Sequence, residues 1–371
     1  MGAKLPQALH TPMFWLLRSG LSLPLVAGPR PSLEMARTLG RTFAQLPTNR
    51  KRIDRACGHL ALACPEFTED ERREHAIRSY EHLFMLGVEI AFAPRLMNED
   101  GWIRHIELDN MATCMQAIFA DRPAILITGH CGNWELTAYT LALLGFPMHA
   151  VYRPLDNKPV DDWVRKTRSR RGLVLLDKWG AVKAIPPLLE ARSPVGFVAD
   201  QNAGDRGLFV PFFGRLASTY KSIGMAAYQH RTSIIVGQAR RLGWNARDDE
   251  AVTNGFAAPH SGDGIRYRIE IEDVFHPEDW ESQPDPLYYI AARYRRGLER
   301  LIRRAPEQYL WMHRMWKSRP RHERLNRPFP DTLRRKLESL PWMTQDELEL
   351  IVERSEQDRA FLAEHNMTRL P

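Results

Sequence analysis

From Pro123 onward, short apolar runs alternate with stretches of helical character, and this alternation restricts the chain to few folds. The runs are bounded by turn residues and occupy residues 123–128, 147–152, 172–176, 194–199 and 233–237. Helical stretches lie between several of them, at 136–144 and 179–191. Strands that are apolar on both faces and alternate with helices predict an α/β fold with a largely parallel central sheet flanked by helices.

Three regions are expected in the chain of 371 residues. Residues 1–118 form a helical, membrane-associating N-terminal region, with helix predicted over 33–118 and a capping box at Thr68–Glu71. Residues 119–320 form the α/β core, in which 243–264 reads as a loop and 265–274 as a strand with one solvent-exposed face. Residues 321–371 form an appendage with helices over 332–340 and 344–365.

The apolar stretch Met13–Ala27 is interrupted by Arg18 and Pro24 and is too short to cross a bilayer. An anchor lying in the membrane interface and an ordinary core helix both fit it.

The segment ITGHCGNWELTAY (127–139) carries the strongest chemical signal. It predicts a buried strand that ends at Thr128, a turn, and a helix that begins near Asn133. His130 then lies at the carboxyl end of a strand, where open α/β sheets hold their sites. With Glu135 in the first helical turn, its carboxylate orients the imidazole of His130 and leaves the other ring nitrogen to take a proton.

Other interpretations of this segment stay open. A single histidine at a strand end is also typical of a packed, hydrogen-bonded residue. Cys131 adjoins His130 and allows a thiol nucleophile, although a small residue that fills the turn explains it more simply. There is no G-x-S-x-G motif for a serine nucleophile, and the four cysteines show no metal-site spacing. We expect free thiols.

Further candidates follow two of the other predicted strands. Arg153 and Asp200 come directly after apolar runs, at the sheet edge expected for His130. The stretch LFVPFFG (208–214) is either an exposed apolar surface for an acyl chain or the bilayer, or part of the core. Arg293, Arg296, Arg300 and Arg304 form one helical stripe, and the formal charge is +7. This basic excess fits an anionic membrane surface or nucleic acid, but no nucleic-acid-binding module accompanies it.

Four motifs in order resemble the bacterial lipid A biosynthesis acyltransferases, the lauroyl and myristoyl transferases of the lysophospholipid acyltransferase superfamily. They are GHCGNWE (129–135), VYRP (151–154), ADQ (199–201) with FVPFFGRLAST (209–219), and APEQYLWMHRMWKSRP (305–320). The resemblance implies that His130 is the general base, with Glu135 as its partner. Arg153, Asp200, Asn133, Gln201 and Arg314 would bind substrate.

The resemblance also implies a reaction and its partners. An acyl chain would pass from acyl carrier protein to a hydroxyl of an anionic glycolipid, a lipid A precursor, at the cytoplasmic face of the bacterial inner membrane, without metal or cofactor. The protein would be peripheral or monotopic there and would not bind nucleic acid. Another glycolipid or a lysophospholipid as acceptor, acyl-CoA as donor, and a non-catalytic binder of anionic surfaces are the alternatives.

Overall fold

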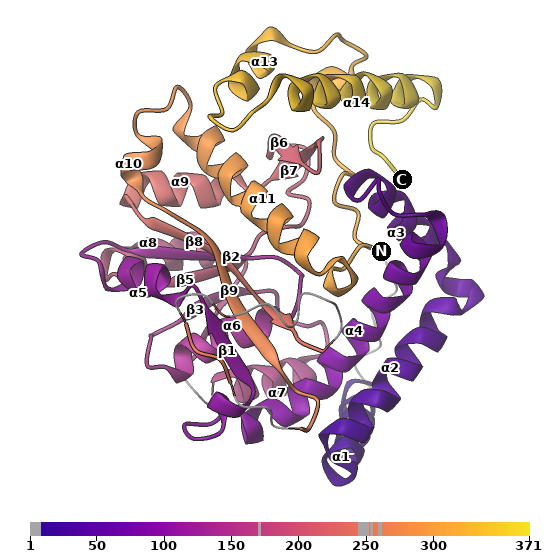
Figure 1. The fold of residues 1–371 in the computed structure, drawn as a ribbon, viewed down its shortest axis with the longest axis vertical. Helices are drawn as coiled ribbons and strands as arrows, with labels where there is room; N and C mark the ends of the chain where they lie inside the picture. Colours follow the sequence, from indigo (N-terminus) through magenta and orange to yellow (C-terminus); the bar gives the residue numbers. More distant parts are fainter. Residues whose placement is uncertain (1–8, 170–171, 244–251, 253–254, 259–261) are drawn as a thin grey trace.

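A seven-stranded sheet lies at the centre of the molecule and is flanked by helices, as the computed structural model shows (Figure 1). The structure describes residues 9–169, 172–243, 252, 255–258 and 262–371. The strand order is β1-β9-β8-β2-β5-β3-β4, and neighbouring strands pair in parallel except for β8 and β9, which pair antiparallel. The α/β fold with a largely parallel sheet is therefore confirmed. Much of the predicted loop 243–264 lies outside the described residues.

The observed strands follow the predicted apolar runs closely. They are β1 (Ile106–Asp109), β2 (Ala124–Thr128), β3 (His149–Tyr152), β4 (Val174–Asp177), β5 (Val195–Val198), β8 (Ser233–Arg241) and β9 (Tyr267–Phe275), with β6 (Leu208–Phe212) and β7 (Arg215–Thr219) as a separate hairpin. The prediction of helix throughout 33–118 is wrong at β1. This short strand is instead an edge of the sheet and pairs in parallel with β9.

The helices fall into three groups along the chain. The N-terminal group is α1 (His10–Ala27), α2 (Pro29–Gln45), α3 (Arg50–Ala63) and α4 (Glu69–Leu96), and the predicted capping box begins α4. The group around the sheet is α5 (Met111–Phe119), α6 (Trp134–Leu143), α7 (Lys158–Arg168), α8 (Ala181–Glu190), α9 (Lys221–His230), α10 (Pro277–Trp280) and α11 (Pro286–Arg304). The C-terminal group is α12 (Arg321–Arg324), α13 (Asp331–Glu338) and α14 (Gln345–Glu364).

Both faces of the sheet are buried, because alternate residues of each strand enter different cores. Ile125 and Ile127 of β2 pack in the core formed with α8, α9 and α11. Ala124 and Leu126 pack in the opposite core with α5 and α6. The stretch 208–214 also points inward, since Val210, Phe212 and Phe213 are buried in the first core, so it is not a greasy outer surface.

Strand β9 has no solvent-exposed face over most of its length, which corrects the expectation from its alternating sequence. Its charged side chains are buried and paired instead. Arg268 donates from Nε to Glu107 of β1 at 2.8 Å, and Glu270 accepts from Arg240 of β8 at 2.7 Å. Charges can alternate along a buried strand when each has a hydrogen-bonded partner on a neighbouring strand.

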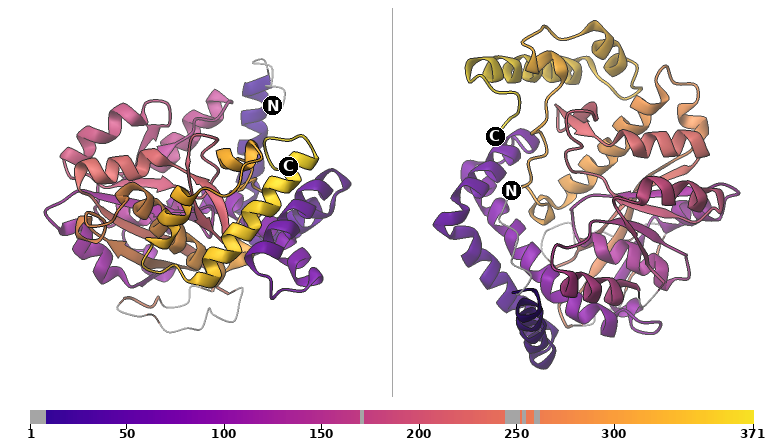
Figure 2. Two further views of the ribbon diagram at one scale, coloured as in Figure 1. Left: turned by 90° about the horizontal axis from the view of Figure 1, so that it is seen from above. Right: turned by 180° about the vertical axis from the view of Figure 1, so that it is seen from behind.

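The C-terminal helices share the main core. Leu337, Leu340, Leu348 and Ile351 belong to the same buried cluster as Ile127 of the sheet. Arg354 of α14 donates to the carbonyl of Leu62 at the end of α3 at 3.5 Å, and Figure 2 shows α14 running beside the N-terminal helices. In the described part of the chain, no helix is both long enough and apolar enough to cross a membrane.

Candidate active site

The turn between β2 and α6 positions His130. Strand β2 ends at Thr128, and Asn133 caps α6 by accepting from the backbone N–H of Leu136 at 3.2 Å. Glu135 lies in the first turn of the helix, as expected. His130 therefore stands at the carboxyl edge of the sheet, where the site was predicted.

The turn closes through Gly132, whose φ of +56° lies in the left-handed region. A Cβ placed on Gly132 would come within 2.0 Å of the carbonyl oxygen of Ala239 in β8. The neighbouring backbone N–H of Asn133 donates to that same oxygen at 2.7 Å. Glycine at this position thus lets the turn lie directly on β8.

Asp200, which was expected to bind substrate, is the carboxylate that lies within hydrogen-bonding distance of His130. The Nδ1 of His130 lies 2.7 Å from Oδ1 of Asp200, which follows β5. Although burial works against the charged carboxylate, His130 and Arg295 keep the pKa of Asp200 well below its usual range. An ionised Asp200 accepts only, so Nδ1 of His130 carries the hydrogen and Nε2 has its lone pair available.

The charge state of His130 follows from two opposing effects. Burial lowers its pKa, whereas the charge and hydrogen bond of Asp200 and the charge of Glu135 raise it. The raising effects are larger together, so the pKa of His130 is above the ordinary value of 6.5. Such a base is stronger than a free imidazole.

Asp200 is itself held by side chains from distant elements. Arg295 of α11 is fully buried and donates to the backbone carbonyls of Asp200 at 2.6 Å and Gln201 at 3.3 Å. The phenol of buried Tyr309 faces Asp200, and its pKa is raised by burial and then by the carboxylate charge. The position of the carboxylate is therefore fixed from β5, α11 and the segment after α11.

A second histidine, His313, lies beside the first and was not predicted. The rings of His130 and His313 are nearly parallel, with centroids 5.4 Å apart. The amide nitrogen of Gln201 lies 3.4 Å from Nε2 of His130 and 3.1 Å from Nδ1 of His313. The sequence signal was only the histidine inside the motif at 305–320.

A buried polar network supports the turn from below. His82 of α4 contacts the carbonyl of Gly132 through Nε2 at 2.9 Å. Glu89 of the same helix accepts from Asn133 at 3.1 Å and pairs with Arg241 at 2.6 Å, and the hydroxyl of Tyr267 donates to it. Asn133, expected to bind substrate, is thus buried and bonded to α4 and α6, away from the cavity lining.

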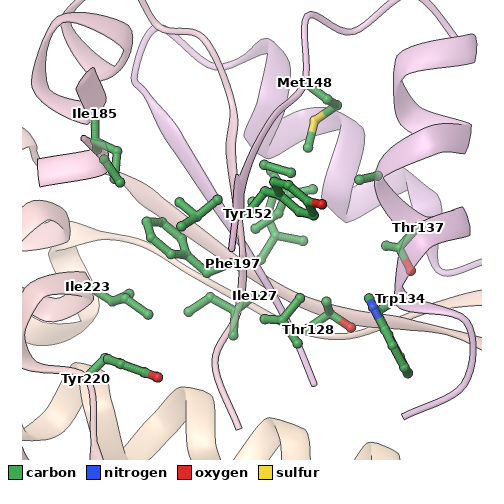
Figure 3. Close-up of a pocket in the computed structure, with 18 of the residues that line it drawn as sticks. Ile127, Thr128, Trp134, Thr137, Met148, Tyr152, Ile185, Phe197, Tyr220 and Ile223 are labelled. Atoms are coloured by element: carbon green, nitrogen blue, oxygen red, sulfur yellow. The ribbon is translucent and has the colours of Figure 1, made fainter. Parts of the chain in front are cut away.

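An apolar cavity of about 770 Å³ begins at His130. Five of its polar lining residues follow the ends of four parallel strands: His130 and Glu135 after β2, Arg153 after β3, Lys178 after β4 and Gln201 after β5. The rest of the lining is largely aliphatic and aromatic. Figure 3 shows Ile185, Ile223 and Tyr220 on one side and Met148, Thr137 and Trp134 on the other.

The cavity reaches both faces of the sheet because two neighbouring strands separate. Strand β3 pairs with β5 only at His149–Val195 and Ala150–Gly196, whereas β2 pairs with β5 as far as Thr128–Val198. Phe197 and Tyr152 line the cavity at this separation (Figure 3). A volume of this size with an apolar lining suits a long, flexible apolar ligand.

The two predicted arginines occupy different places. Arg153 is exposed at the cavity and has no ion-pair partner among the described residues. Arg314 is exposed next to His313 but does not line the cavity. Arg55 donates to the backbone carbonyl of Met312, two residues before Arg314, at 3.3 Å, and burial, followed by the charge of Arg314, lowers the pKa of Arg55.

Other candidate groups have structural partners. Cys131 is buried, and burial raises the pKa of its thiol, which disfavours the nucleophilic thiolate. In the arginine stripe of α11, Arg293 pairs with Asp273, while Arg300 and Arg304 pair with Glu272. Within the described ranges, no group of three or more His, Cys, Asp or Glu side chains is placed to hold a metal ion.

A histidine base oriented by a buried carboxylate, at the strand ends of an α/β sheet and beside a long apolar cavity, defines an enzyme site suited to a substrate with a fatty chain. Comparison with known proteins agrees. The sequence model of the bacterial lipid A biosynthesis acyltransferases matches residues 2–246. The chain belongs to this family and is an O-acyltransferase.

Curated relatives match over most of their length. The chain is 27% identical over 319 residues to the lipid A biosynthesis palmitoleoyltransferase of Escherichia coli (strain K12), covering 84% of this chain and 94% of that protein. It is 27% identical over 331 residues to the lipid A biosynthesis lauroyltransferase of the same organism, covering 85% and 96%. A lipid A biosynthesis acyltransferase of Haemophilus influenzae is 25% identical, covering 85% and 96%.

Replacing Gly132 by alanine tests the contact between the turn and β8. The added Cβ meets the Ala239 carbonyl at 2.0 Å in a strained backbone conformation, so we expect a loss of at least about 2 kcal/mol in the free energy of unfolding. Urea denaturation followed by circular dichroism measures it. Gly58→Ala is the matched control, because this exposed helical glycine has nothing within 4 Å of an added Cβ and gains about 0.5–1 kcal/mol. Equal stability of the two variants would contradict the contact.

Proposed function

We propose that this protein transfers a fatty acyl group from the thioester of acyl carrier protein to a hydroxyl group of a lipid A precursor, with His130 as general base. The observation that carries the proposal is the His130–Asp200 pair, in which Nδ1 of His130 contacts the carboxylate and the histidine lines the apolar cavity. Family membership supports the acyl transfer to lipid A.

The reaction needs no covalent enzyme intermediate. Nε2 of His130 takes the proton of the acceptor hydroxyl while its oxygen attacks the thioester carbonyl. The tetrahedral intermediate then collapses, the C–S bond breaks, and the departing thiolate takes the proton back from Nε2. Asp200 stabilises the imidazolium between these steps, and Glu135 adds a second negative charge nearby.

The cavity would hold the acyl chain. Its apolar lining begins at His130 and continues between β3 and β5, so a chain inserted there would place its carbonyl at the polar end. Water exclusion along such a lining favours the bound chain by roughly 0.8 kcal/mol per buried methylene.

Cations in and near the cavity would bind the anionic headgroup of the acceptor. Arg153 lines the cavity, and Arg55 is bonded to the segment that carries Arg314, with no ion-pair partner for any of the three among the described residues. Two guanidinium groups brought together without a carboxylate suit a phosphate, which accepts several N–H donors at once. These positions support the assignment of Arg153 and Arg314 to substrate binding.

The N-terminal helices would attach the protein to the cytoplasmic face of the bacterial inner membrane. On α2, one face is buried against the fold, while Met35 and Leu39, one turn apart, are 48% and 52% exposed. On α1, Trp15 and Leu16 are 56% and 70% exposed, and the guanidinium of Arg18 lies over the Trp15 ring. Exposed apolar and aromatic side chains with a nearby cation suit the interface of an anionic bilayer.

The transfer itself is tested with purified protein in detergent, acyl carrier proteins charged with chains of several lengths, and a tetra-acylated lipid A precursor. Mass spectrometry should show a gain of one acyl chain. His130→Ala should lower the rate by at least about 10²-fold, because the imidazole oriented by Asp200 is lost. His365→Ala changes an exposed histidine of the C-terminal region and should leave the rate unchanged.

The outcomes separate the alternatives. If acyl transfer is seen only with another glycolipid or a lysophospholipid, that lipid is the acceptor. If it is seen only with acyl-CoA, acyl-CoA is the donor. Near-normal turnover in His130→Ala would refute the base assignment. Full activity is expected in Cys131→Ser, and a trapped acyl thioester on Cys131 would instead favour a covalent mechanism.

The pH dependence of the reaction tests the carboxylate. Because the base must be neutral, kcat/KM should fall with decreasing pH through the pKa of His130, above 6.5. Asp200→Asn removes the charge that raises this pKa, so the acid limb should move to lower pH and kcat should fall by about 10²–10⁴-fold. Asp205→Asn, whose partner is Arg369, should change neither. An unmoved acid limb in Asp200→Asn would count against the pair.

Membrane attachment is measured by sedimentation with vesicles of phosphatidylethanolamine and phosphatidylglycerol. Replacing Met35 and Leu39 together by serine should weaken partitioning by about tenfold or more, because two apolar side chains no longer enter the interface. Leu325→Ser removes a similarly exposed side chain near the C-terminal helices and should have no effect. Equal losses in both proteins would show that α2 is not the attached face.

A further inference from the structure

The side-chain amide of Gln201 is placed between two imidazoles that both require a donor. Asp200 takes the Nδ1 hydrogen of His130, so Nε2 of His130 is an acceptor, 3.4 Å from the amide nitrogen. The same nitrogen lies 3.1 Å from Nδ1 of His313. An amide NH₂ has two hydrogens and serves both contacts, whereas the amide oxygen would serve neither.

His313 is suited to remain an acceptor at Nδ1. Burial lowers its pKa, and the charge of His130 lowers it further, so the ring stays neutral when His130 is protonated. With Nδ1 accepting from Gln201, the hydrogen of the neutral ring is on Nε2. Two stacked histidines thus have pKa values shifted in opposite directions, which gives them different roles.

We propose that Gln201 donates an N–H to the thioester carbonyl oxygen as negative charge develops on it, and that His313 is a positioning residue that fixes the orientation of the Gln201 amide. This inference rests on the proposed acyl transfer. It adds no bond-making step, because the proton still moves between the acceptor hydroxyl, His130 and the leaving thiolate.

The geometry places the donor where the charge forms. The attacked carbonyl must lie next to Nε2 of His130, and the Gln201 nitrogen is 3.4 Å from that atom and lines the cavity. The contact is longer than an ordinary hydrogen bond, so the acceptor hydroxyl can replace it at little cost. One N–H then turns to the carbonyl oxygen while the other stays on His313. Arg295 fixes the Gln201 backbone through its carbonyl.

Once the acceptor hydroxyl has replaced the contact with His130, the remaining contact with His313 distinguishes the two ends of the amide. A rotation about the last side-chain bond would present the amide oxygen to the developing negative charge, and the interaction would become repulsive. A single oriented donor to such an oxygen contributes about 10²–10³-fold to kcat. His313 would therefore act on the rate only through Gln201.

A double-mutant cycle tests this dependence with the full-length protein in the transfer assay. Gln201→Leu should lower kcat by about 10²-fold with little change in KM, and His313→Leu should lower it by about tenfold or more. The double variant should be no slower than Gln201→Leu alone. His313→Asn should recover most of the rate lost in His313→Leu, because the Asn amide oxygen can accept near the position of Nδ1.

A binding measurement keeps the inference separate from the identity of the reaction. The monoanionic methyl ester of dodecylphosphonate resembles the charged intermediate, and its affinity is read by calorimetry, with dodecanol as the uncharged control. Gln201→Leu and His313→Leu should weaken phosphonate binding by about tenfold and leave dodecanol binding unchanged.

The kinetic and binding measurements test different parts of the inference. Losses that multiply in the double variant, or an Asn variant as slow as the Leu variant, would overturn the role of His313. Unchanged phosphonate affinity in Gln201→Leu would overturn the donor role. If the wild-type protein transfers no acyl group but the phosphonate affinities change as expected, the proposed function fails and the assignment of Gln201 and His313 stands.

Discussion

The buried charge of Asp200 ties the active site together. A carboxylate that is 1% exposed is stable only when hydrogen bonds and opposite charge compensate for the lost water. Here the compensation comes from His130 after β2, from Arg295 on α11 and from the phenol of Tyr309. Since these groups come from separate segments, a single charge fixes their relative positions. The same interaction raises the pKa of His130 above the ordinary value, so holding the site together and strengthening its base are one effect.

A second buried carboxylate, that of Glu89, holds the turn between β2 and α6 in place, as Asp200 holds the imidazole of His130. Glu89 compensates Arg241 and accepts from Asn133 and Tyr267, while His82 contacts the carbonyl of Gly132. Glu89 and His82 both belong to α4, so a helix of the N-terminal group forms part of the support of the catalytic turn. Removing either member of such a pair leaves the other charge uncompensated, at a cost of about 3–5 kcal/mol. The N-terminal helices therefore contribute to the site itself as well as to the surface proposed to contact the membrane.

The sequence predicted those features that depend on local pattern. Strands apolar on both faces, the turn before α6 and the location of His130, Arg153 and Asp200 at one sheet edge all follow from periodicity and from the rule for parallel sheets. Strand β1 was missed because it has only four residues, two of them acidic, and buried Glu107 is compensated by Arg266 and Arg268, which lie far away in the sequence. The partner of His130 was assigned to nearby Glu135, whereas Asp200 is 70 residues away in the chain. Distances between the ends of different strands depend on sheet order and twist, which no local pattern contains. His313 and Arg295 were missed for the same reason.

The C-terminal helices acquire a role from the segment that they hold. Residues 309–318 pass beside the turn that carries His130, and the backbone N–H of Leu310 donates to the carbonyl of His130 at 3.2 Å. This segment also carries Tyr309 and His313, and it ends at Arg319, which is buried between Glu323 of α12 and Asp358 of α14 at 2.6 Å from each. Asp358 in turn pairs with Arg215 at the hairpin of β6 and β7. Because Arg319 is paired with Glu323 of α12 and Asp358 of α14, the segment that carries His313 is anchored to the C-terminal helices. Residues 321–371 thus form part of the structural support of the site, as α4 does on the other side of the turn.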